Sequence, residues 1–128
     1  MQRPRPPVYL AAYAPATMRR VARRADGFLP GVLPGAGQAA TDIAANITVP
    51  YAQIREMAEQ EGRDPATIGA ILRVYPLAHV APQETADMIL RAGESGIDHV
   101  QVDQHWITSS FDHALELAGR TLDLARRG

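Results

Sequence analysis

A turn near the N-terminus is the first place in the sequence where chemistry could be built. The run "VYLAAYAPATM" predicts an apolar strand over residues 8–12 that leads directly into a helix beginning at Pro15. A helix N-terminus can bind an anion, because its first N–H groups are unpaired and the helix dipole favours negative charge. Thr17 either adds a hydroxyl to such a site or is simply an early polar residue of the helix. The turn Tyr13-Ala14-Pro15 contains no glycine, so a ligand would meet side chains there.

The histidines are the second set of residues that could do chemistry. His105 stands beside Trp106, and this pair could act as a general acid or base behind an aromatic wall, because histidine titrates near neutral pH. The alternative is a histidine in a surface loop. The four histidines show no spacing typical of a metal site, and the chain has no cysteine, which excludes thiol catalysis and thiolate zinc sites. We therefore predict no bound metal.

Length and charge narrow the class of protein. The chain has 128 residues, the size of one domain, and its formal net charge is −1. Such a balance provides no overall field that would attract nucleic acid or anionic lipid. The N-terminus has no apolar region of the kind found in signal peptides, and no apolar run is long enough to span a membrane. We expect a cytoplasmic protein that binds a small molecule rather than nucleic acid or a membrane.

Strand and helix signals alternate four times along the chain, which predicts an α/β protein of the form (βα)4. The predicted strands cover residues 8–12, 27–30, 71–77 and 97–103. Apolar stripes at helical spacing follow them, and Gly62 and Gly96 mark the ends of two helices. Residues 31–48, rich in glycine, proline and alanine, predict a long mobile loop.

Two architectures compete for this order of elements. One is an open parallel sheet with helices on both faces, and the other is a segment of a barrel with helices on one side only. The last strand favours the barrel. Val100 and Val102 would face the helices, and His99, Gln101 and Asp103 would share a polar opposite face that suits the inside of a barrel near its mouth. We predict one domain over residues 1–128 that forms a (βα)4 half of a TIM-type (β/α)8 barrel.

Three segments also carry a family resemblance: "RPPVYLAAYAPATMRRVARRADGFLP", "EMAEQEGRDPATI" and "AGESGIDHVQVD". In this order, the chain resembles the C-terminal half of the luciferase-like monooxygenase family, and within it the deazaflavin (coenzyme F-420) dependent oxidoreductases. The resemblance implies that the four predicted strands are strands five to eight of the family barrel. It further implies a flavin-type oxidoreductase that performs hydride transfer or monooxygenation with coenzyme F-420 or FMN.

The resemblance also implies two groups of site residues. The turn that holds the cofactor phosphate in the family corresponds here to Ala12, Tyr13, Ala14 and Thr17, although Tyr13 and Ala14 replace its glycine-rich pattern. The substrate would meet the C-terminal ends of the strands. The residues expected at this mouth are Tyr75, His79, Asp103, Gln104 and Trp106, with His105 as the candidate catalyst.

Half of the family barrel has no counterpart in the sequence. A four-strand arc would expose two edge strands and an apolar inner face, so we expect a homodimer, a higher homo-oligomer or a complex with an N-terminal half-barrel. Three functions remain open. The chain could regain an oxidoreductase site by assembling, it could be a non-catalytic oligomeric half-barrel that binds a phosphorylated ligand weakly or not at all, or it could be an unrelated open α/β binding module.

Overall fold

The computed structural model describes residues 5–97, 99–104 and 107–128. Within these ranges, strands and helices alternate as the sequence predicted. The strands are β1 (Tyr9–Leu10), β2 (Gly27–Phe28), β3 (Gly31–Val32), β4 (Gly69–Val74) and β5 (His99–Val102). The helices are α1 (Pro15–Arg24), α2 (Gln38–Thr41), the π-helical turn η1 (Ala44–Thr48), α3 (Val49–Gln60), the 3-10 turn η2 (Pro65–Thr67), α4 (Pro82–Glu94) and α5 (Phe111–Arg127).

The five strands form one parallel sheet, and β2 and β3 behave as a single interrupted strand. Gly27 of β2 pairs with Gly69, and Gly31 of β3 pairs with Arg73, so both keep the same register on β4. The interruption falls at Pro30, which has no N–H to donate. With β2 and β3 counted together, the strands lie side by side in chain order, from β1 through β4 to β5.

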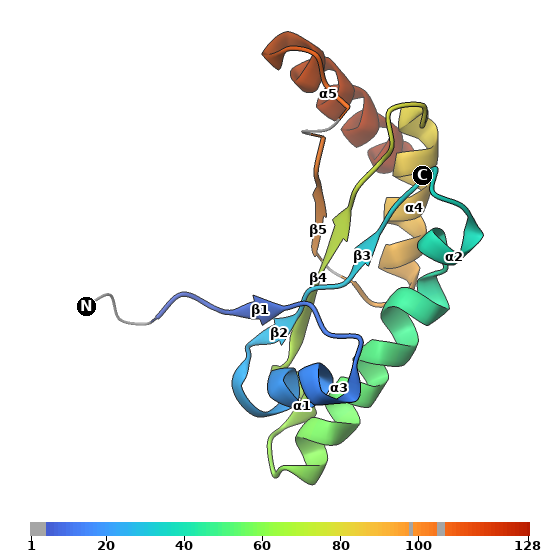
Figure 1. Ribbon diagram of the computed structural model, residues 1–128. Coiled ribbons are helices and arrows are strands. Elements are labelled where there is room, and N and C mark those ends of the chain that lie inside the picture. The colour runs from blue at the N-terminus through green and yellow to red at the C-terminus, as the bar shows by residue number, and fades with distance from the viewer. Residues whose placement is uncertain (1–4, 98, 105–106) are drawn as a thin grey trace.

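The helices cover one face of this sheet (Figure 1). Phe28 is fully buried with Val21 of α1 and Ile54 of α3 in a first core cluster. Leu72 and Val74 of β4 belong to a second cluster that includes Met88 and Ala92 of α4. A parallel sheet in chain order with helices on one face is a barrel arc, because a doubly wound sheet reverses its strand order and is covered on both faces. The predicted fold class, an α/β half of a TIM-type barrel, is confirmed.

The alternation of β5 follows the sequence-based prediction. Val100 and Val102 are partly buried and pack against the second core cluster, while His99 and Gln101 are exposed on the opposite face. Successive side chains of a strand point to opposite faces, so this opposite face is the one that helices leave uncovered. It is the concave side of the arc, and it is called the inner face below.

The segment "EGRDP" shows how the sequence closes one strand–helix unit. Gly62 follows α3 with φ of 75°, and the N–H groups of Gly62 and Arg63 donate to the carbonyl groups of Glu59 and Ala58. This is a Schellman motif, which places a glycine at the left-handed position just beyond the helix. The Arg63 guanidinium then donates to the carbonyl oxygens of Ala22 and Ala25, at 3.3 and 2.6 Å. The Arg63 side chain therefore hydrogen-bonds the carbonyl groups at the C-terminal end of α1, and the backbone N–H of the same residue completes the motif that terminates α3.

Residues 31–48 contain more structure than the predicted loop. The strand β3, the short helix α2 and the turn η1 all lie in this segment, and Val32 and Ile47 are fully buried. Sequence periodicity missed β3 because a strand of two residues is too short to alternate. The mobility of the segment stays a prediction.

Candidate functional site

The inner face has its densest group of polar side chains where the strands end. Arg73 and Tyr75 alternate with the fully buried Leu72 and Val74, and they therefore lie on the inner face. The Arg73 guanidinium lies over the Tyr75 ring, 4.6 Å from its centroid, and its Nη2 atom lies 3.8 Å from Asp103 Oδ2. Backbone pairing holds this group in place, since the Asp103 N–H donates to the Val74 carbonyl at 2.9 Å.

Arg73 has a side-chain donor that no other described residue uses. Its Nε atom is buried and has no hydrogen-bond partner among the described residues. An unpaired buried donor costs about 1–3 kcal/mol. A buried donor without a partner at the ends of the strands is typical of a group that binds a ligand. An acceptor on the ligand would complete its hydrogen bond and remove this energetic cost.

The Tyr75 ring packs over the backbone of a glycine in the neighbouring strand. Gly31 lies next to Arg73 in the ladder, and a Cβ atom there would meet the Tyr75 ring at 3.4 Å. The Gly31 N–H donates to the hydroxyl oxygen of Tyr13 at 2.9 Å. At the other end of the inner face, the Tyr9 ring lies across Gly27 and Gly69, where no side chain competes for the space. The Tyr9 ring thus covers the inner face at Gly27 and Gly69, whereas the group around Arg73 lies at the other end of the strands.

The predicted phosphate turn is internally bonded. The Thr17 hydroxyl donates to the Ala14 carbonyl at 2.8 Å and accepts from the Ala14 N–H at 3.2 Å. Ala12 is buried, and the Tyr13 ring, half exposed, packs edge-on against Phe28 at 5.9 Å between centroids. These four residues lie together at the end of β1, as expected. Their role in binding a cofactor stays a prediction.

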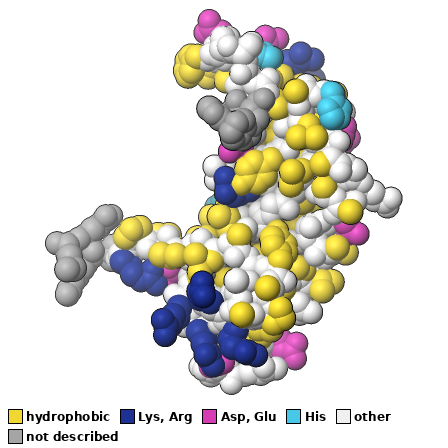
Figure 2. Space-filling view, in the orientation of Figure 1, with side chains coloured by type: hydrophobic (Ala, Val, Ile, Leu, Met, Phe, Trp, Pro, Cys, Tyr) yellow, Lys and Arg dark blue, Asp and Glu magenta, His cyan; other side chains and the backbone are white. Residues whose placement is uncertain are grey.

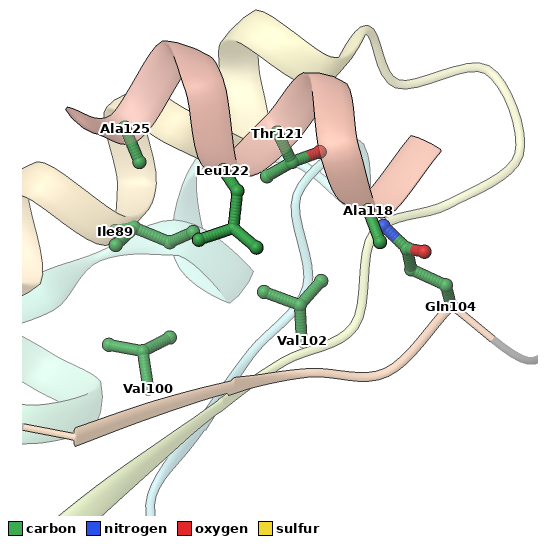
Figure 3. Close-up of a pocket in the computed structure, with 8 residues that line it drawn as sticks. All are labelled: Ile89, Val100, Val102, Gln104, Ala118, Thr121, Leu122 and Ala125. Atoms are coloured by element: carbon green, nitrogen blue, oxygen red, sulfur yellow. The ribbon is translucent and has the colours of Figure 1, made fainter. Parts of the chain in front are cut away.

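The residues predicted at the mouth are only partly brought together. Tyr75 and Asp103 share the Arg73 group on the inner face. His79 lies in the loop before α4 and packs against Gly35. Gln104 lies on the helix side of its strand, where it lines a cleft with Val100 and Val102 (Figure 3). His105 and Trp106 lie outside the described residues. The contribution of each residue to substrate binding stays a prediction.

The cleft at Gln104 is apolar and lies between α5 and the sheet. It has a volume of about 340 Å³ and is lined by α4, β5 and α5. Figure 3 shows Val100, Val102, Leu122 and Ile89 pointing into it from three elements. It is on the outer side of the sheet, away from Arg73.

The perturbed acidic groups lie outside the Arg73 group. Hydrogen bonds from the Arg5 guanidinium, at 2.6 and 2.9 Å, together with the Val8 N–H, lower the pKa of Asp26. Arg23 donates a hydrogen bond to Glu61 across α1 and α3 and lowers the pKa of that carboxyl in the same way. Both pairs join neighbouring segments, so their role is structural.

Two kinds of site are not found in the part of the chain that the structure describes. No group of three or more histidine, aspartate or glutamate side chains there could hold a metal ion. None of the helices within the same residues is both long and apolar enough to cross a bilayer.

Sequence reasoning missed Arg73. The signal was present, because an arginine interrupts the otherwise apolar run "ILRVYPL" of a predicted strand. A charged residue inside such a run is rarely buried without a partner or a function. Only the three-dimensional structure shows its unpaired Nε atom and its contacts with Tyr75 and Asp103.

One comparison with known proteins, that with solved structures, bears on the fold. No protein-family model matches the sequence, and no curated protein matches it. Among solved structures, the chain is similar to that of a long-chain alkane monooxygenase, LadA, with a TM-score of 0.62 and 13% sequence identity. The similarity covers 96% of this chain and 42% of the monooxygenase chain, so the protein spans less than half the length of the structure it matches. At this identity, the likeness establishes a shared fold: a parallel α/β arc that corresponds to part of a larger protein.

Proposed function

We propose that this chain is the C-terminal half of a luciferase-like oxidoreductase that uses a flavin or deazaflavin for hydride transfer or monooxygenation. Two independent findings support this. The ordered segments of the sequence resemble that family, and the fold is similar to that of a monooxygenase. The observation that carries the proposal is the Arg73 group, which places an unused donor at the carboxyl ends of parallel strands, where barrel enzymes bind their ligands.

The residues of the inner face fit an anionic, planar ligand. Arg73 offers a positive charge and an N–H that has no partner among the described residues, and Tyr75 offers an aromatic surface. The turn at Thr17 fits less well, since the Ala14 N–H and the Thr17 hydroxyl already bond each other. Either FMN or coenzyme F-420 would supply the electron or hydride chemistry when bound. The chain itself would bind and orient the cofactor, with Arg73 as the main residue that binds its negative charge.

The charges of the Arg73 group also restrict the polarity of the ligand that can bind there. A plain hydrocarbon placed against Arg73 and Asp103 would remove water from two charged groups without replacing its hydrogen bonds. We therefore propose that the part of the ligand that meets this end of the sheet is polar or anionic. An apolar portion would lie elsewhere on the inner face, for example against the ring of Tyr9.

A second candidate function is a non-catalytic oligomeric half-barrel, located like the first in the cytoplasm. The internally bonded turn at Thr17 favours it, because the phosphate site of the family is partly replaced by protein contacts. In this case the chain would bind a phosphorylated ligand weakly or not at all.

Titration with FMN and with coenzyme F-420 tests the first proposal. We expect a saturable change of cofactor fluorescence with the purified chain, and affinity lower by about 10-fold or more in Arg73→Met, since hydrogen bonds to charged groups contribute about 1.5–3 kcal/mol. Arg91→Met, which changes an exposed arginine of α4, is the matched control and should bind like the wild type. Tyr75→Phe keeps the ring beside Arg73 and should also bind normally, whereas Tyr75→Leu should not.

The outcomes separate the two candidates. Saturable binding that depends on Arg73 supports the oxidoreductase. The absence of a saturable signal with either cofactor contradicts it and leaves the non-catalytic half-barrel. Binding that Arg73→Met leaves unchanged would show that the cofactor uses another part of the chain.

A further inference from the structure

Both outer strands of the arc are open. Within the described residues, β1 pairs only with β2, and β5 pairs only with β4. The Asp103 N–H is directed at β4, so alternate backbone groups along β5 point to the open side. Soluble proteins cover, charge or pair such edges, because unpaired N–H and C=O groups bind other strands.

Exposed apolar side chains gather next to the β5 edge. Phe111, Leu115 and Leu122 are 76%, 56% and 51% exposed, and they form a stripe along α5. The adjoining flank of α5 packs on α4, with Thr121 buried beside Leu122 in the cleft. Leu122 belongs both to this stripe and to the 340 Å³ cleft over Val100 and Val102. The apolar surface is therefore continuous from the cleft to the free flank of α5.

The solvent-accessible surface area of the chain also indicates that part of its surface is covered in an assembly. A compact monomer of 13.9 kDa is expected to expose about 6,700 Å². This chain exposes 8082 Å². The excess, about 1,400 Å², includes the exposed residues 5–8 and is within the range that each subunit of an obligate dimer buries.

We propose that a second copy of this chain covers these surfaces and closes an eight-stranded ring. In such a dimer, β5 of one copy pairs with β1 of the other, in parallel, at two equivalent seams related by a two-fold axis along the barrel. All four open edges are then paired. The cleft under α5 receives apolar side chains of the partner's β1 and of Val8 just before it, which is 45% exposed.

The closed ring brings charged residues of α1 and α5 next to each other. Arg23 of α1 bonds Glu61 at 2.8 Å, which shows the flank of α1 that faces α3. Arg20 and Arg24 lie away from that flank and have no ion pair among the described residues, and Figure 2 shows arginines gathered over this part of the molecule. In the closed ring, α1 becomes the neighbour of the partner's α5, whose exposed charged residues are Asp112, Glu116 and Asp123 together with Arg120, Arg126 and Arg127. Glu116 already pairs with Arg120 of its own helix, whereas Asp112 and Asp123 have no ion pair among the described residues and would be the partners of Arg20 and Arg24 across each seam.

Light scattering on the flavin-free 128-residue chain tests the assembly. We expect a particle of twice 13.9 kDa that dissociates on dilution. Leu122→Glu should weaken dimerisation by about 30-fold or more, as buried apolar anchors do. Val49→Glu is the matched control, because Val49 is also 51% exposed but lies on α3, away from both edges. Circular dichroism establishes that each variant is folded.

Cross-linking identifies the surfaces that meet. The chain has no cysteine, so Val8→Cys and Leu115→Cys each introduce a single reactive thiol on an exposed residue. A short bis-maleimide should cross-link a mixture of the two variants and neither variant alone, because β1 meets α5 only across a seam. A monomer at every concentration, a larger oligomer, or cross-links within one variant would overturn the proposal. Since no cofactor is present, failure of flavin binding leaves this result unaffected.

Discussion

The Arg73 guanidinium lies over the Tyr75 ring, 4.6 Å from its centroid, two residues along the same strand. The pair occupies the inner face, because Leu72 and Val74, the alternating residues, are fully buried beneath α4. A charged side chain is thus held against an aromatic surface at the open end of the sheet. The arrangement leaves Arg73 Nε buried and unpaired among the described residues, which is unfavourable for the isolated fold.

Replacing Arg73 should therefore cost little stability. Arg73→Met removes the unpaired donor and the cation–π contact together, and these opposing effects are each about 1–2 kcal/mol. We expect the free energy of unfolding to change by less than about 1 kcal/mol, measured by urea denaturation. A loss of several kcal/mol would show instead that Arg73 is a structural residue.

Arg63 is expected to behave in the opposite way. Its guanidinium donates to the carbonyl oxygens of Ala22 and Ala25 at the end of α1. Arg63→Met leaves these groups without their charged donor and should lower the free energy of unfolding by about 1–3 kcal/mol. Arg91→Met, at an exposed position of α4, serves as the control in the same urea titrations and should change stability by less than about 0.5 kcal/mol.

Substitutions at two glycines distinguish the effect of backbone strain on stability from that of side-chain packing. Among the described residues, a Cβ atom at Gly62 or at Gly93 would meet nothing within 4 Å beyond the adjacent residues and, for Gly93, the backbone of its own helix. Gly62 has φ of 75°, so Gly62→Ala should destabilise the protein by about 1 kcal/mol. Gly93 lies inside α4, and Gly93→Ala should stabilise it by about 0.5–1 kcal/mol. Thermal melts of both variants measure the two effects, and shifts of equal sign would contradict this account.

Asp26 should make stability depend on pH in the acid range. Hydrogen bonds from Arg5 and from the Val8 N–H lower its pKa in the folded state, whereas an unfolded aspartate titrates at about 3.9. The stabilisation is therefore complete above about pH 4–5 and is lost as the pH falls through the lower folded pKa. Asp26→Asn should be less stable than the wild type at pH 7, and the difference should shrink towards pH 2–3.

Urea midpoints of both proteins across this range provide the measurement. The exposed α3 variant Glu59→Gln is the control, because Glu59 lies away from both edge strands, and it should show no comparable change with pH. A difference between Asp26→Asn and wild type that is constant with pH would show that the carboxylate charge is not responsible.

The sequence alone determined the order of the elements and the faces of the last strand. Apolar stripes of helical spacing predicted α1, α3, α4 and α5, because an amphipathic helix needs a stripe whatever it packs against. Gly62 and Gly96 marked two helix ends for a local reason, since only glycine adopts positive φ without strain. Val100 and Val102 were assigned to the helix side from alternation alone, and the structure confirms it.

Only the tertiary structure decided the strand register and the contacts between residues that are far apart in the sequence. The register that joins β2 and β3 into one interrupted strand depends on pairing with β4, which lies about forty residues further along the chain. The Arg73 group likewise brings together Tyr75 and Asp103 from neighbouring strands, and Gln104 faces away from it although it follows Asp103 directly. Such contacts arise when the sheet folds, because strand pairing and not sequence spacing decides which side chains share a face.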